Sequence, residues 1–381
     1  MATIHPMLPS VVDEIVTEAK RFESDEINVN LKIIPQVDGV RTRTDLVCVI
    51  DVSGSMGVEV TNGDANESQG LRVIDVVKHA AKTVVKTLNQ YDRFCLVSYS
   101  NTSEVKFPLS IMDEQGKENA CNAIDVLIVG GQTNLWDGLH NGVKVLNDNK
   151  DNIHTGAVLL LTDGQPNIVP PRGHIAHLKQ FRDEYGLDCS VSTFGFGYNL
   201  DSQLLKDLAR EGQGSYSFIP DGSFVGTAFI NTTSNILSTA LRNVKIKIEV
   251  ACDISCLGYD DVMTKTSWGY EIPISSINVD QNKDILIKTS KENSSIIDAM
   301  KITIEYVNRS SEIKSIECNE INFIEDVSHD IEVNIMRLNF VVTVDNAIKD
   351  FNAGNHSDAQ QKIIHLIEQV KQTKAYQGQN V

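Results

Sequence analysis

The pattern of hydrophobic and polar residues divides this chain into four successive segments. An early segment, Ile27–Ile34, has a period of two, which is typical of a half-buried antiparallel strand, and we recognise no partner strand near it. Apolar runs then alternate with amphipathic stretches, the period of two returns, and the chain ends with helical spacing. We expect four segments with the bounds 1–42, 43–242, 243–328 and 329–381.

The second segment predicts a mostly parallel sheet with helices on both faces. Its apolar runs include Leu46–Ile50 and Ala157–Thr162, and amphipathic stretches such as Leu71–Leu88 separate them. Uniformly apolar strands that alternate with helices are typical of a Rossmann-like α/β domain. Ligands of such sheets bind at the carboxyl ends of the strands.

The third segment predicts an antiparallel β-sandwich. Val244–Val250 and Ile302–Val307 alternate apolar and polar residues, with polar turns between the strands. We expect the isolated strand at Ile27–Ile34 to complete this sandwich, so that the α/β domain is inserted into it. The last segment has helical spacing on both sides of a break at Asn352–Asn355, which predicts a helical hairpin.

Charge and composition exclude several classes of function. The 381 residues contain 34 Lys+Arg and 51 Asp+Glu, a net charge of −17, so nucleic acid and anionic membranes are not expected partners. We find no signal peptide and no transmembrane segment. Seven cysteines, an odd number, fit reduced thiols better than a disulfide framework. We therefore expect a cytoplasmic protein.

Oxygen donors gather at the predicted carboxyl edge of the sheet. Asp51, Ser53 and Ser55 follow the first apolar strand, Thr133 lies in a loop before a helix, and Asp163 ends the strand at 157–162. Carboxylates and hydroxyls without thiolate or imidazole suit a hard cation such as Mg²⁺. These five residues are our candidate metal ligands.

The pattern Asp51-x-Ser53-x-Ser55, Thr133 and Asp163-Gly resembles the metal-ion-dependent adhesion site of von Willebrand factor type A domains. The resemblance implies Mg²⁺, or Mn²⁺ or Ca²⁺ in its place, bound by the hydroxyls of Ser53 and Ser55. Thr133 would join them in the ligand-competent state, and Asp51 and Asp163 would act directly or through water. The flanking segments resemble intracellular eukaryotic proteins in which this domain precedes a β-rich segment and a helical hairpin.

From this resemblance we expect a non-enzymatic, Mg²⁺-dependent protein-binding scaffold whose metal is completed by an acidic residue of a partner. The loop at 57–70 is longer than usual for such domains and borders the site. We expect the partner to contact a rim formed by Gly57, Gln132, Asn134, Gln165 and Asn167. The alternative is a cytoskeletal or trafficking assembly protein that binds through the sandwich and the hairpin, with a merely structural metal.

Other motifs carry weaker hypotheses. The Asp and Ser residues of the motif could simply cap helices. Ser53 lacks the Gly-x-Ser-x-Gly context of a hydrolase nucleophile. His174 and His177 could ligate a metal, but we expect ordinary surface histidines near a helix start. Cys252 and Cys256 have no second pair to complete a zinc site.

Overall fold

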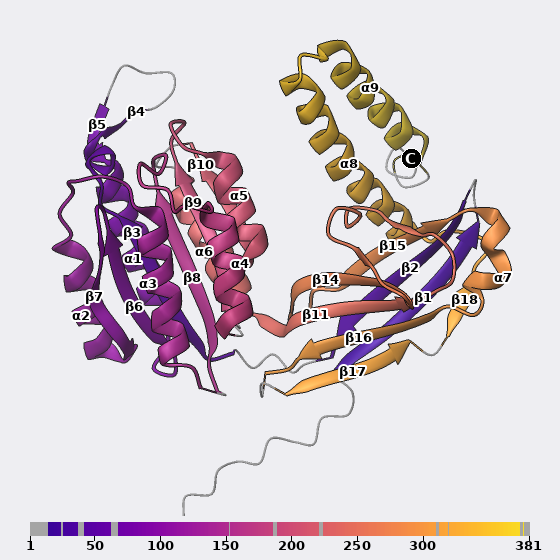
Figure 1. The fold of residues 1–381 in the computed structure, drawn as a ribbon, viewed down its shortest axis with the longest axis horizontal. Coiled ribbons are helices and arrows are strands. Elements are labelled where there is room, and N and C mark those ends of the chain that lie inside the picture. Colours follow the sequence, from indigo (N-terminus) through magenta and orange to yellow (C-terminus); the bar gives the residue numbers. More distant parts are fainter. Residues whose placement is uncertain are drawn as a thin grey trace, which may run out of the picture. The chain divides into compact units, whose positions relative to one another are not determined.

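The computed structural model of the protein forms two compact units (Figure 1). One unit is Val40–Thr239 with Arg309–Ser311, and the other combines Met1–Gly39, Ala240–Asn308 and Glu312–Val381. The structure describes residues 14–23, 26–36, 42–61, 68–151, 153–185, 189–220, 224–309, 312–318, 320–373 and 376.

A six-stranded sheet forms the centre of the unit at 40–239. Its strand order is β10-β9-β8-β3-β6-β7, and every pairing is parallel except that of β6 with β7. The central strands β3 and β8 consist almost entirely of buried residues, as their uniformly apolar sequences require. The strands are β3 (Thr44–Asp51), β6 (Arg93–Tyr99), β7 (Ser103–Ile111), β8 (Thr155–Thr162), β9 (Cys189–Phe196) and β10 (Gln213–Ile219).

Helices cover both faces of this sheet. Residues of α1, α2 and α6 share one apolar core with β3, and residues of α3, α4 and α5 share the other. The helices are α1 (Val73–Thr87), α2 (Glu114–Asp125), α3 (Leu135–Asp148), α4 (His174–Tyr185), α5 (Ser202–Glu211) and α6 (Val225–Leu237). Because helices bury both faces of the sheet, β3 has apolar residues on both of its faces.

Three details of this unit differ from the sequence-based interpretation. The edge strand β7 was not predicted. Part of the expected 57–70 loop is a two-stranded ribbon of β4 (Glu59–Thr61) and β5 (Ser68–Arg72), while 62–67 lie outside the described residues. His174 is 4% exposed, so the expectation of a surface histidine was wrong there.

The second unit contains two five-stranded sheets around a separate core. Their orders are β12-β15-β2-β1-β18 and β13-β14-β11-β16-β17. The strands are β1 (Ile15–Glu23), β2 (Ile27–Pro35), β11 (Thr239–Glu249), β12 (Ser255–Cys256), β13 (Thr264–Lys265), β14 (Gly269–Asn278), β15 (Lys283–Thr289), β16 (Lys301–Val307), β17 (Ile313–Cys318) and β18 (Ile321–Phe323). The short helices η2 (Lys291–Asn293) and α7 (Ser294–Ile297) connect β15 to β16.

The strand at Ile27 does have a neighbouring partner, contrary to our interpretation of the sequence. β1 directly precedes β2 and pairs with it antiparallel along nine residue pairs, from Ile15↔Pro35 to Glu23↔Ile27. The pairing of β1 with β18 is parallel, an exception in an otherwise antiparallel sheet. β2 also pairs with β15, so the early strands lie within the sandwich as expected.

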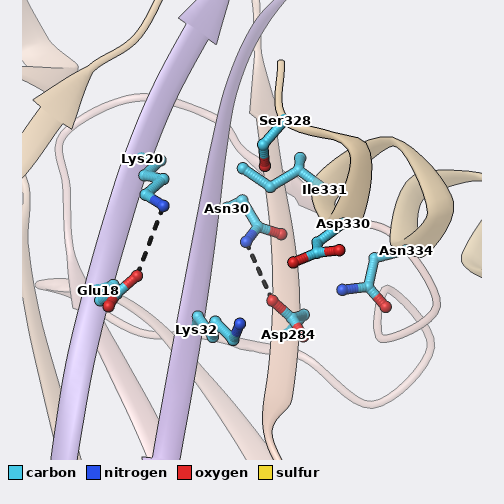
Figure 2. A pocket seen from close by; sticks show the side chains of 9 residues that line it. All are labelled: Glu18, Lys20, Asn30, Lys32, Asp284, Ser328, Asp330, Ile331 and Asn334. Carbon is cyan, nitrogen blue, oxygen red and sulfur yellow. Dashed lines mark hydrogen bonds and ion pairs between the residues drawn. The ribbon is translucent and has the colours of Figure 1, made fainter. Parts of the chain in front are cut away.

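Helices α8 (His329–Asn352) and α9 (His356–Gln372) form the hairpin at the end of the described chain. Ile331 in the first turn of α8 is 5% exposed and packs with Phe22 and Leu286. Figure 2 shows this first turn over the polar outer face of β1, β2 and β15, where Asn30 donates to Asp284 at 3.1 Å. The hairpin is therefore anchored to the sheet at its start.

These observations confirm the predicted fold class. A Rossmann-like sheet with helices on both faces is inserted into a largely antiparallel sandwich, and a helical hairpin follows. Within the described residues, no helix has the length and apolar character needed to cross a membrane.

Candidate functional site

Three loops meet at the carboxyl edge of the central sheet. β3 ends at Asp51, and β8 ends at Thr162 directly before Asp163. The parallel register places Ile50 beside Leu161, so the two strand ends lie side by side. The first loop also joins the loop before α3, because Gly54 N–H donates to the Gly131 carbonyl at 3.1 Å.

The two serine hydroxyls and one carboxylate of the predicted set are in direct contact. Ser53 Oγ lies 3.1 Å from Ser55 Oγ, and Ser55 Oγ donates to Asp163 Oδ1 at 2.7 Å. A Cβ added to Gly164 would lie 3.5 Å from Ser55 Oγ and 4.0 Å from Thr133 Oγ1. The structure thus brings donors from all three loops around one small volume, and a glycine keeps that volume open.

Asp51 lies beneath these hydroxyls, and its carboxylate is held from both sides. Its Oδ1 accepts from the Ser53 backbone N–H at 2.8 Å, and its Oδ2 accepts from Thr162 Oγ1 at 2.7 Å. Tyr99 OH approaches the same Oδ2 at 3.4 Å. Asp51 is 0% exposed, so these bonds fix its position within the sheet edge.

Burial makes the charged form of both carboxylates costly. Burial raises the pKa of Asp51, and the hydrogen bonds from Thr162 and Ser53 oppose that rise. The pKa of Asp163 is raised to about 6, mainly by burial; the hydrogen bond from Ser55 opposes this rise, and the negative charge of Asp51 adds to it. A positive charge beside these two acids would remove the electrostatic cost that burial imposes.

A second set of hydrogen bonds shapes the Thr133 loop. Thr133 N–H donates to Asn167 Oδ1 and Asn167 N–H donates to the Thr133 carbonyl, both at 3.0 Å. Gln132 N–H donates to Asn101 Oδ1 at 2.7 Å. Asn134 caps α3 by accepting from the Asp137 N–H at 3.4 Å. This network leaves Thr133 only 4% exposed.

The predicted rim residues surround this centre with different exposures. Gln132, Gln165 and Asn167 are exposed, and Asn134 is half-buried. Gly57 is half-buried at the end of the short helix η1 (Gly54–Gly57). The side chain of Asn167 is already engaged with the Thr133 loop.

The donor set fits a hard cation. Neighbouring ligands of an octahedral Mg²⁺ ion lie about 3.0 Å apart when each is 2.0–2.1 Å from the metal, which is close to the 3.1 Å between Ser53 Oγ and Ser55 Oγ. Among the described residues, no three His, Cys, Asp or Glu side chains cluster as metal ligands. A metal here would therefore depend on hydroxyls and water as well as on the two carboxylates.

Sequence reasoning did not include three supporting residues. Thr162 and Tyr99 bind the Asp51 carboxylate, and Asn101 orders the loop before Thr133. Thr162 could have been found from its position directly before Asp163. It ends β8, which runs parallel to β3, so its hydroxyl can reach Asp51 at the end of β3. Tyr99 and Asn101 lie around the end of β6, and their sequence carries no comparable signal.

Comparison with known proteins agrees with this architecture. The family model for the von Willebrand factor type A domain matches residues 46–165. Arabidopsis thaliana E3 ubiquitin-protein ligase WAV3 is 27% identical over 227 residues, covering 57% of this chain and 26% of that protein. Escherichia coli YfbK, an uncharacterized protein, is 27% identical over 209 residues, covering 54% of this chain and 33% of its own. The chain thus spans about a quarter to a third of these relatives.

Two solved structures share the fold across nearly the whole chain. A von Willebrand factor type A protein from Catenulispora acidiphila has a TM-score of 0.69 at 13% identity, covering 93% of this chain and 86% of that one. The ArnB paralog VWA2 from Sulfolobus acidocaldarius has a TM-score of 0.57 at 14% identity, covering 96% of this chain and 93% of that one. This chain contains a von Willebrand factor type A domain, a protein-interaction and adhesion module.

Proposed function

We propose that the carboxyl edge of the sheet binds a divalent cation, Mg²⁺ by preference, and through it an acidic side chain of a protein partner. Ser53, Ser55 and Thr133 would hold the ion, with Asp51 and Asp163 in direct or water-mediated support. The bound cation would supply a positive centre that attracts a carboxylate. The observation that carries the proposal is the Ser53–Ser55–Asp163 contact, with its 3.1 Å and 2.7 Å oxygen separations.

The charge balance supports an acidic rather than a basic partner group. With the two carboxylates acting through water, the three neutral hydroxyls would leave a divalent ion with its positive charge and with coordination positions to fill. A partner carboxylate can take one of these positions. The exposed Gln132 and Gln165 at the rim are polar and uncharged, so they can hydrogen-bond to a partner without repelling its acid.

The proposed role is binding rather than catalysis. A metal-bound water needs a nearby general base, and the two carboxylates of this site are engaged with Ser53, Ser55 and Thr162. Relatives named E3 ubiquitin-protein ligases match only part of their length here, so we do not assign their activity to these residues. We propose a cytoplasmic location, which the seven cysteines support because an odd number fits reduced thiols.

Affinity capture from the native cell, run in parallel with Mg²⁺ and with EDTA, tests this function. We expect a partner that is retained by the wild type with Mg²⁺ and is lost with EDTA and with Ser53→Ala. Partners that persist unchanged in EDTA would instead favour assembly through the sandwich and the hairpin, with a structural metal.

A further inference from the structure

The helical hairpin leaves an apolar surface open on the unit that does not carry the candidate metal site. Phe340 is 55% exposed and Phe351 is 58% exposed on α8, and Ile367 is 48% exposed on α9. Val333, Val341, Ile348 and Ile364 are also more than two-fifths exposed. Contiguous exposed apolar surface of this kind marks interaction sites in soluble proteins.

With the exception of Val341, these residues follow helical seams. On α8 the spacing of three or four residues links Val333, Arg337, Phe340, Val344, Ile348 and Phe351. On α9 it links Gln360, Ile364, Ile367 and Lys371. We call these ten residues the hairpin seam. Alternating steps of three and four are the pattern by which one helix packs against another.

Both halves of the seam lie on the same side of the hairpin. The two helices contact each other near the buried residues Ala347 of α8 and Ala359 and Leu366 of α9. At roughly 100° per residue, the α8 seam is rotated by about 60° from Ala347 and the α9 seam by about 120° from Ala359 and Leu366, in the same sense. Because the helices are antiparallel, as the Lys362–Asp350 ion pair requires, rotations of the same sense point to one side.

The seam carries positive charge and no acid. Arg337 and Lys371 are both exposed and are its only charged members. A second copy of the chain, paired symmetrically through this surface, would bring four cations together without a seam carboxylate to neutralise them. Charge therefore favours a different occupant, one that carries acidic groups.

We infer that the hairpin seam binds an amphipathic helix of a partner whose apolar stripe is flanked by acidic side chains. The α8 part of the seam runs from Val333 to Phe351, about 27 Å at 1.5 Å per residue. A partner helix of about 18 residues would match that length. The anchoring of α8 through Ile331 holds the start of the seam against the sheet.

Fluorescence anisotropy with two designed peptides tests this inference on the full chain. Both peptides are 21-residue helices with leucine at the two apolar heptad positions; one has glutamate at the flanking positions and the other has lysine. We expect the glutamate peptide to bind at least tenfold more tightly, although the chain as a whole carries a charge of −17 and would attract the lysine peptide.

Three variants test the apolar and charged parts of the seam separately. Phe340→Asp, at a half-exposed position, should lower the affinity for the glutamate peptide at least tenfold. The double variant Arg337→Glu with Lys371→Glu should reverse the preference between peptides. The double variant Lys301→Glu with Lys349→Glu makes the same charge change at exposed residues outside the seam and should leave the preference intact.

Failure of the glutamate peptide to bind, or equal affinity for both peptides, would overturn the inference. Sedimentation of the free chain provides a further check. A dimer that Phe340→Asp dissociates would show that a second copy, not an acidic helix, occupies the seam. None of these outcomes depends on Mg²⁺, so they are independent of the proposed metal site.

Discussion

Gly138 couples the packing of α3 to the candidate metal site. A Cβ at this position would lie 2.4 Å from Cδ1 and 2.5 Å from Cγ of Tyr99. The Tyr99 ring is fully buried, and its hydroxyl approaches Asp51 Oδ2 at 3.4 Å. Gly138→Ala must therefore displace either the ring or the helix.

The size of the effect follows from two opposing contributions. Forcing an extra methyl group into a packed core costs about 1–3 kcal/mol, whereas replacing a helical glycine by alanine gains up to about 1 kcal/mol. Gly226 on α6 provides a control, because a Cβ there meets nothing within 4 Å. Both variants gain helix propensity, so this gain largely cancels when their unfolding free energies are compared. Gly138→Ala should therefore be less stable than Gly226→Ala by about 1–3 kcal/mol.

Urea unfolding followed by tryptophan fluorescence measures this difference. The chain has two tryptophans, so Trp268→Phe leaves Trp136, on α3, as the reporter of this unit. We expect Gly138→Ala to unfold at lower urea than Gly226→Ala. Equal midpoints would refute the argument that the close contact between α3 and Tyr99 requires glycine.

Three further substitutions test the packing around the site and the hairpin. Thr162→Val removes the 2.7 Å bond to the Asp51 carboxylate and should lower the unfolding free energy by about 1.5–3 kcal/mol, measured in urea; an unchanged value would contradict this. Arg93→Met leaves the carboxylate of Asp45, which is 3% exposed, without its bidentate partner and should lower the unfolding free energy by about 3 kcal/mol. Adding Asp45→Asn should recover part of this loss, because it removes the unpaired buried charge. If nothing is recovered, a buried charge is not the cause. Ile331→Ala should cost about 2–5 kcal/mol and increase hydrogen exchange at the start of α8, and unchanged exchange would argue against this anchor.

The central sheet could be predicted from the sequence because its strands are buried on both faces. β3 and β8 are apolar almost throughout, and the polar residues that follow them stand out for that reason. The edge strand β7 could not be recognised in this way. It pairs only with β6 and is mostly exposed, so its sequence alternates weakly and even contains Pro108.

Two other differences arise from tertiary contacts. β1 includes Arg21, which would mark a surface strand, yet Arg21 is 8% exposed because it bonds to Glu23, Ser294 and Asp298. Asp298 and Ser294 are distant in sequence, so no local pattern indicates this burial. Likewise, the contact between Ser55 and Asp163 spans 108 residues. The motif predicted their proximity through the topology of the parallel sheet, while Tyr99 emerged only from side-chain positions.

The measurement that tests the central claim most directly is calorimetric titration with Mg²⁺ of the wild type and Ser53→Ala, with Ser110→Ala as the control. Ser110 pairs with Phe94 near the start of β6, at the opposite edge of the sheet from the site. We predict one saturable binding event in the wild type and in Ser110→Ala, and a greatly weakened one in Ser53→Ala. Negligible heat in all three proteins, or equal binding in all three, would contradict a cation site at Ser53, Ser55 and Thr133.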